Sequence, residues 1–162
     1  MMQKPERKKN RLSGYDYASC GAYFITICTN HRQHLFWNNV GATCGRPPTS
    51  PPLSPIGEVV RDEILCLDET YEAVQLDHYC IMPNHIHLLL LIRSDADGRP
   101  QVAPTISRII QQFKGAVTKK VGHAIWQKSF HDHIIRNRED YLTVWRYIDE
   151  NPLKWHLDSL CQ

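Results

Sequence analysis

The chain has 162 residues, of which 42% are hydrophobic and 22% are charged, and its formal net charge is +2. These values are typical of one globular domain with a proper core, so we expect a single domain over residues 1–162. No apolar run reaches membrane-spanning length, and the first residues lack the apolar segment of a signal peptide. The six cysteines include no Cys-x-x-Cys pair, so we expect a reducing, cytoplasmic location.

Positive charge is concentrated in two stretches of the chain. Residues 1–14 form a basic arm that includes Lys8, Lys9 and Arg11. Residues 98–131 contain six cations and no acidic residue. A plain lysine-rich surface is one explanation of this second stretch. Two basic patches on a nearly neutral protein favour the other explanation, which is a polyanionic partner.

Hydrophobic spacing and turn residues predict the elements of the first half of the chain. Aromatic and β-branched residues predict a first strand, and a segment rich in proline and glycine then predicts an exposed loop. A serine followed by a proline predicts the start of a helix, and a Pro-Asn turn predicts an antiparallel hairpin. These elements are a strand over 22–29, a loop over 38–55, a helix from 55 to about 68, and strands over 74–82 and up to 92.

The second half of the chain adds two helices and one strand. A helix beginning near 104–105 buries an apolar stripe and exposes a basic side with Arg108, Lys114 and Lys119. A short strand follows within 126–136, and a last helix runs over 138–150. The order β-α-β-β-α-β predicts an α+β fold: a ferredoxin-like antiparallel sheet with an added C-terminal helix.

The hairpin contains the most informative residues, His85 and His87. Side chains alternate along a strand, so both imidazoles should lie on one face, about 6.6 Å apart along the backbone. Two buried imidazoles are costly unless each has a partner. Two unrelated histidines, each hydrogen-bonded at the mouth of the strand, are one explanation. The other is a divalent metal ion, which would use both side chains together.

The last helix places Tyr147 and Asn151 one turn apart on a shared edge. Taken alone, such a pair is most simply surface decoration. Beside two histidines, however, the asparagine oxygen could be the third protein ligand of a divalent ion. The remaining coordination positions of the ion would stay open for phosphate oxygens. A phenol brought to that ion could then attack phosphorus and form a covalent phosphotyrosine. Tyr141 falls in the apolar stripe of the same helix, so we expect it in the core.

Three segments, in this order along the chain, carry a family resemblance. They are Met82-Pro83-Asn84-His85-Ile86-His87-Leu88, Trp126-Gln127 with Phe130-His131-Asp132-His133-Ile134-Ile135-Arg136, and Tyr147-Ile148-Asp149-Glu150-Asn151-Pro152-Leu153-Lys154. Together they resemble the REP-associated tyrosine transposases, which belong to the single-tyrosine HUH transposases and share the signature His-hydrophobic-His. The resemblance extends from about Tyr15 to Lys154, and the proline-rich loop is its least family-like part.

The resemblance implies an enzyme of transposition and DNA recombination. It would cleave and rejoin single-stranded DNA at hairpin-forming repeats through a 5′-phosphotyrosine intermediate, with Mg²⁺ or Mn²⁺ as cofactor. Tyr147 would be the nucleophile, and the metal ligands would be His85, His87 and Asn151. A monomer or homodimer would hold the DNA backbone with these basic residues: Lys8, Lys9, Arg11, Arg108, Lys114, Lys119 and Arg136.

Two other activities and a second histidine pair need to be weighed. A histidine-triad phosphohydrolase would need a third histidine where Leu89 stands, which nearly excludes that class. A domesticated protein that binds DNA hairpins without catalysis is the remaining alternative.

The pair His131 and His133 encloses an aspartate where the signature requires a hydrophobic residue. We therefore expect His133 to support the site or the structure and His131 to be exposed.

Overall fold

The computed structural model describes residues 19–38, 52–93 and 105–157, with the side chains of the last two residues excepted. The predicted basic arm, with Lys8, Lys9 and Arg11, lies outside the described residues, as does most of the proline-rich loop. No helix in the described part of the chain is long and apolar enough to cross a membrane.

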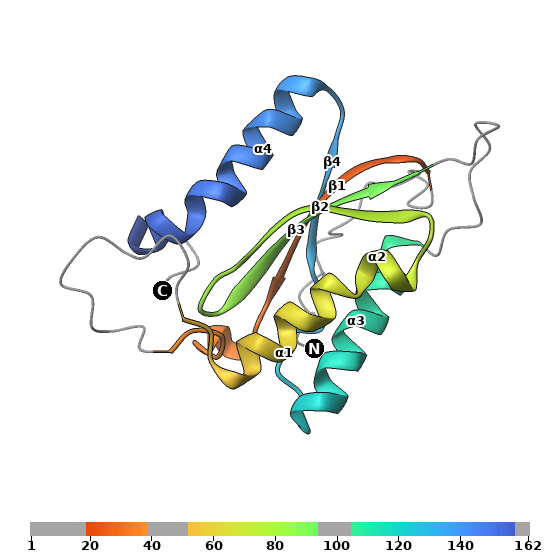
Figure 1. Ribbon diagram of the computed structural model, residues 1–162. Helices are drawn as coiled ribbons and strands as arrows, with labels where there is room; N and C mark the ends of the chain where they lie inside the picture. Colours follow the sequence, from red (N-terminus) through yellow and green to blue (C-terminus); the bar gives the residue numbers. More distant parts are fainter. Residues whose placement is uncertain (1–18, 39–51, 94–104, 158–162) are drawn as a thin grey trace, which may run out of the picture.

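A four-stranded antiparallel sheet with helices on both faces forms the body of the molecule, which confirms the predicted mixture of helices and antiparallel strands (Figure 1). The strand order across the sheet is β2-β3-β1-β4. The elements are β1 (Gly21–Cys28), a short 3-10 turn (Asn30–Arg32), α1 (Pro55–Leu65), α2 (Leu67–Thr70), β2 (Val74–Ile81), β3 (His85–Ile92), α3 (Ile106–Val121), β4 (His131–Ile135), α4 (Arg138–Glu150) and a final 3-10 segment (Asn151–Leu157).

Strand β3 is buried on both faces, as predicted, because helices cover the sheet from two sides (Figure 1). Its residues Ile86, Leu88 and Leu90 are fully buried in the larger core, which includes apolar side chains of α1 and α3. Leu89, on the opposite face, packs in a smaller core with Val144 and other residues of α4. The side-chain alternation of one strand therefore separates the main core from the face that α4 covers.

The turn between β2 and β3 is fixed by hydrogen bonds from three segments. The Met82 N–H donates to the carbonyl of His85 at 2.9 Å and closes the predicted turn. The Thr29 N–H donates to the carbonyl of Asn84 at 2.8 Å, and the Leu35 N–H donates to the carbonyl of Pro83 at 2.8 Å. Because buried backbone groups need partners, these bonds determine where β3 begins.

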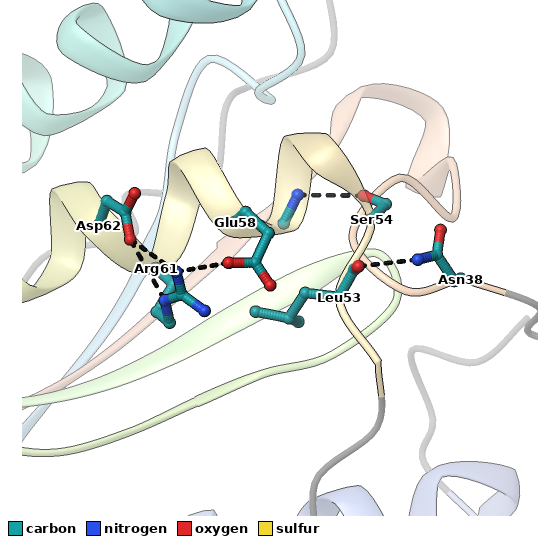
Figure 2. Close-up of polar contacts among 7 residues, drawn as sticks. Asn38, Leu53, Ser54, Glu58, Arg61 and Asp62 are labelled. Atoms are coloured by element: carbon teal, nitrogen blue, oxygen red, sulfur yellow. Dashed lines mark hydrogen bonds and ion pairs between the residues drawn. The ribbon is translucent and has the colours of Figure 1, made fainter.

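Helix α1 begins where the sequence predicts, at the Ser54-Pro55 cap. Ser54 Oγ accepts the Gly57 N–H at 3.0 Å, and Asn38 Nδ2 donates to the carbonyl of Leu53 at 2.8 Å (Figure 2). A β-carbon added at Gly57 would lie 2.2 Å from the carbonyl oxygen of Phe36, so only glycine fits this close approach. The predicted helix to residue 68 is split in two, because the chain turns after Leu65.

Two residues of α4 are less buried than the sequence predicts. Trp145, expected in the apolar stripe, is 39% exposed and stacks on His78 of β2 with ring centroids 4.4 Å apart. Tyr141, expected in the core, is half-buried, and its hydroxyl donates to Asp77 Oδ2 at 2.6 Å. The apolar spacing located the face of α4 correctly, but polar side chains of β2 provide part of its contact surface.

Lys114 is half-buried, and this corrects its predicted place on the exposed side of α3. Its ammonium group donates to the carbonyls of Gln127 at 2.8 Å and Ser129 at 2.9 Å, in the segment that leads into β4. Burial lowers the pKa of Lys114 to about 8, although the nearby Cys28 opposes this shift. The side chain therefore holds α3 against this segment.

We expect this lysine to give the fold a specific dependence on pH. The folded chain releases the proton of Lys114 near pH 8, whereas the unfolded chain keeps it to about 10.5. Between these values the unfolded state binds more protons, so stability rises with pH. Urea titrations should show the wild type gaining stability relative to Lys114→Met from about pH 8 to about pH 10. Lys119→Met, at an exposed lysine of the same helix, is the matched control; a difference independent of pH would contradict the assignment.

Candidate active site

The two histidines of β3 lie side by side beneath α4. The exposed fraction is 0% for His85 and 2% for His87, and their Nε2 atoms are 3.1 Å apart. Both side chains lie on the predicted face of the strand, opposite the large core. Two polar rings in this setting must satisfy their nitrogen atoms within the protein.

Each imidazole is oriented by a partner on its second nitrogen. His85 Nδ1 is 2.8 Å from Oδ1 of Asn84, and His87 Nδ1 is 2.8 Å from Oγ1 of Thr26. Thr26 stands directly opposite His87 in the pairing of β1 with β3. These contacts turn both Nε2 atoms toward the same point. Neither Asn84 nor Thr26 was predicted from the sequence as a partner of the histidines, although the Pro-Asn turn was a signal for Asn84.

The environment favours the neutral form of His87. Burial lowers its pKa well below the ordinary value of 6.5, and repulsion from a protonated His85 would lower it further. The ring is therefore neutral at pH 7. A neutral imidazole with an accessible Nε2 is the form that binds metal ions.

The geometry of the pair fits a small divalent ion. Two ligands that each lie about 2.1 Å from one ion are about 3.0 Å apart at a right angle and about 3.4 Å apart at the tetrahedral angle. The observed 3.1 Å between the Nε2 atoms lies between these values. Within the described residues, no third His, Cys, Asp or Glu forms a metal-binding group with them. A further side-chain ligand from this part of the chain would therefore come from another residue type, and an amide oxygen is one that divalent ions accept.

Asn151 is a suitable source of that oxygen. Along the chain it lies four residues from each of two residues that contact the histidines: Tyr147, with its ring centroid 5.2 Å from that of His87, and Trp155, with its centroid 5.9 Å from that of His85. Asn151 is 4% exposed, and its buried Nδ2 atom has no hydrogen-bond partner among the described residues. An amide rotated by 180° would present oxygen at this unpartnered position.

Tyr147 lies at the open side of the pair. The residue is 45% exposed, so part of it is accessible to a large substrate. Its ring meets that of Phe24 edge-on at 5.9 Å, and Phe24 stacks on His87 at 5.1 Å. The three rings thus form one cluster with a tyrosine at its surface. The sequence did not indicate Phe24 as part of this site, because the side chains next to Phe24 depend on how β1 pairs with β3.

The second tyrosine of α4 is less suited to attack. Its hydrogen bond to Asp77, together with burial, raises the pKa of Tyr141 to about 12. The phenolate of Tyr141 is therefore harder to form at neutral pH than that of an ordinary tyrosine, whose pKa is about 10. Of the two, Tyr147 is the one placed beside the histidine pair.

The second histidine pair does not join the site. His133 Nε2 lies 2.9 Å from both carboxylate oxygens of Asp140, in the first turn of α4. This hydrogen bond lowers the pKa of Asp140. His131 is exposed, as expected. The role of His133 in the described contacts is to hold the start of α4 to β4.

The predicted basic contacts fall on different sides of the molecule. Arg108 and Lys119 are exposed on α3, which covers the face of the sheet opposite to α4 (Figure 1). Arg136 is exposed after β4, close to the start of α4. The two residues of α3 are therefore not brought together with the histidine pair.

Comparisons with known proteins place this geometry in context. No family model matches the chain. An uncharacterized protein of Haemophilus influenzae is 31% identical over 95% of the chain and 92% of its own length. A second protein of that organism, named "Putative REP-associated tyrosine transposase", is 30% identical over 55% of the chain, and the match spans 53% of its own length.

A solved structure has the same fold. It is described as the REP-associated tyrosine transposase bound to a REP hairpin; the TM-score is 0.62 at 23% identity, and the match covers 89% of this chain and 74% of the other. The expected resemblance is therefore confirmed in sequence by a curated relative over 55% of the chain, and the fold agrees with that of a solved REP-associated tyrosine transposase.

Proposed function

We propose that the chain is a metal-dependent single-stranded DNA endonuclease and strand transferase that acts at hairpin-forming repeats. One observation carries the proposal: an exposed tyrosine, Tyr147, has its ring 5.2 Å from that of His87 in a buried histidine pair. The proposal includes a ferredoxin-like interpretation of the sheet, with α4 as the helix that carries the nucleophile. The resemblance to REP-associated tyrosine transposases supports both parts.

Three residues would hold the ion in this proposal: His85 and His87 through Nε2, and Asn151 through its amide oxygen. Two neutral nitrogens and one neutral oxygen leave an ion's double positive charge uncompensated, which suits a phosphate ligand. When bound, Mg²⁺ or Mn²⁺ supplies positive charge that stabilises the charge developing on the phosphate oxygens. Burial of the ligands keeps their geometry fixed before the DNA arrives.

The chemical step belongs to Tyr147. Its phenol loses a proton to solvent, and its oxygen attacks the scissile phosphorus. A bond forms between the tyrosine oxygen and phosphorus, and the bond from phosphorus to the 3′ oxygen breaks. The 3′ oxygen takes up a proton and leaves as a free hydroxyl. Attack by a 3′-hydroxyl on the phosphotyrosine reverses these changes and rejoins the strand.

The DNA partner is a single strand with a hairpin, by analogy with the solved structure, whose protein is bound to a REP hairpin. Arg136 precedes α4, whereas Tyr147 lies in the last turn of that helix, so Arg136 contacts the strand at a distance from the cleavage site in this proposal. Arg108 and Lys119, on the other side, contact a more distant part of the DNA. The arm residues Lys8, Lys9 and Arg11 remain predicted phosphate contacts.

A histidine substitution tests the metal site. We expect His87→Ala to abolish cleavage of a labelled hairpin oligonucleotide. It should also weaken Mn²⁺ binding by more than roughly 100-fold, because loss of a group that only hydrogen-bonds a metal ligand can already cost that much. Hairpin affinity measured in EDTA should be unchanged, because the ion does not hold the fold of the sheet. His131→Ala, at an exposed histidine of β4, should cleave normally. Full cleavage by His87→Ala would contradict the assignment.

A tyrosine substitution tests the nucleophile against the inactive alternative. Tyr147→Phe removes one oxygen, so hairpin binding should survive while the covalent protein–DNA adduct disappears from a denaturing gel. Tyr141→Phe is the matched control on the same helix and should still form the adduct. It loses only the hydrogen bond to Asp77, with a stability cost of about 1 kcal/mol. An adduct from Tyr147→Phe but not from Tyr141→Phe would show that the wrong tyrosine is assigned. A wild-type protein that forms no covalent adduct would favour the alternative, a protein that binds DNA hairpins without catalysis.

A further inference from the structure

The two histidines of the pair differ in the partners that hold them. The carbonyl oxygen of the Asn84 side chain can only accept a hydrogen bond, and its amide group donates to the carbonyl of Arg32 at 3.3 Å, which sets its orientation. His85 Nδ1 must therefore carry a proton to make its 2.8 Å contact with Asn84. It follows that Nε2 of neutral His85 is an acceptor.

The partner of His87 imposes no such choice. A hydroxyl group can donate or accept, and Thr26 Oγ1 lies 2.8 Å from His87 Nδ1. Thr26 is 8% exposed and stands opposite His87 in the register of β1 with β3. When no ion is bound, the two Nε2 atoms form a hydrogen bond at 3.1 Å. Because Nε2 of His85 is the acceptor, Nε2 of His87 must carry the proton. The Thr26 hydroxyl then donates to Nδ1.

We propose that Thr26 is a positioning residue for the metal site, because its hydroxyl accepts the Nδ1–H of His87 when an ion takes Nε2. This inference rests on the proposed function of the pair. An ion withdraws electrons from the ring and makes Nδ1–H a stronger donor, so the acceptor contributes more when the ion is bound than when it is absent. His85 already carries its proton on Nδ1, where Asn84 accepts it, so His85 keeps its tautomer when an ion binds. His87 alone changes tautomer on binding.

Removing the hydroxyl should weaken metal binding without disturbing the strand. Valine has nearly the shape of threonine and suits a β-strand, so Thr26→Val leaves packing intact and deprives the bound imidazole of its acceptor. Loss of such an outer-shell partner typically costs 10–100-fold in metal affinity. Serine keeps the hydroxyl, so Thr26→Ser should bind nearly as well as the wild type.

Calorimetric titration of the full chain with Mn²⁺ tests this directly. Thr26→Val should lose about 10–100-fold in affinity, with Thr26→Ser close to the wild type and Thr143→Val, an exposed control on α4, unchanged. Equal affinity of Thr26→Val and wild type would overturn this inference alone. Equal losses in the valine and serine variants would also overturn it, because packing would then be the cause. A wild type that binds no Mn²⁺ would overturn the proposed metal site as well.

A measurement on the wild type keeps the inference testable if the valine variant fails to fold. Nitrogen–proton correlation spectra of the imidazoles report which ring nitrogen carries the proton. Addition of Mg²⁺ should move the proton of His87 from Nε2 to Nδ1, while His85 keeps its proton on Nδ1. A change at His85 in place of His87 would contradict the role given to Thr26.

Discussion

The burial of two imidazole rings in an apolar strand is the constraint on which the rest of the site depends. An unsatisfied buried polar group costs about 1–3 kcal/mol, so four ring nitrogens in this position need partners. The hairpin turn gives Asn84 to one ring, and the neighbouring strand gives Thr26 to the other. The two remaining nitrogens face each other at 3.1 Å. That arrangement is satisfied by one shared proton or by one metal ion.

The same strand connects this site to the stability of the fold. One face of β3 contributes Ile86, Leu88 and Leu90 to the large core, so the backbone that carries the histidines is held rigidly. The other face is covered by α4 through a smaller core and polar contacts with β2. A rigid metal-binding strand is thus combined with a helix whose outer edge stays exposed, and the exposed edge carries Tyr147.

The parts of this arrangement that could be predicted are those that depend on local spacing. Alternation along one strand placed His85 and His87 on one face, and helical spacing separated Tyr147 from Tyr141. Contacts between strands could not be predicted, because the register that brings Thr26 and Phe24 to His87 depends on the whole sheet. Charge was also a poor guide to exposure. The long apolar stem of Lys114 allows it to be half-buried, and its ammonium group binds backbone carbonyls.

The central claim is that the histidine pair holds a divalent ion beside Tyr147. It is tested most directly by a crystal structure of the full chain grown with Mn²⁺, in which anomalous scattering locates the ion independently of the protein. We predict one strong peak within about 2.3 Å of the Nε2 atoms of His85 and His87, with the amide of Asn151 turned toward it. An anomalous map with Mn²⁺ bound elsewhere, or with no peak at the pair at saturating Mn²⁺, would contradict the account.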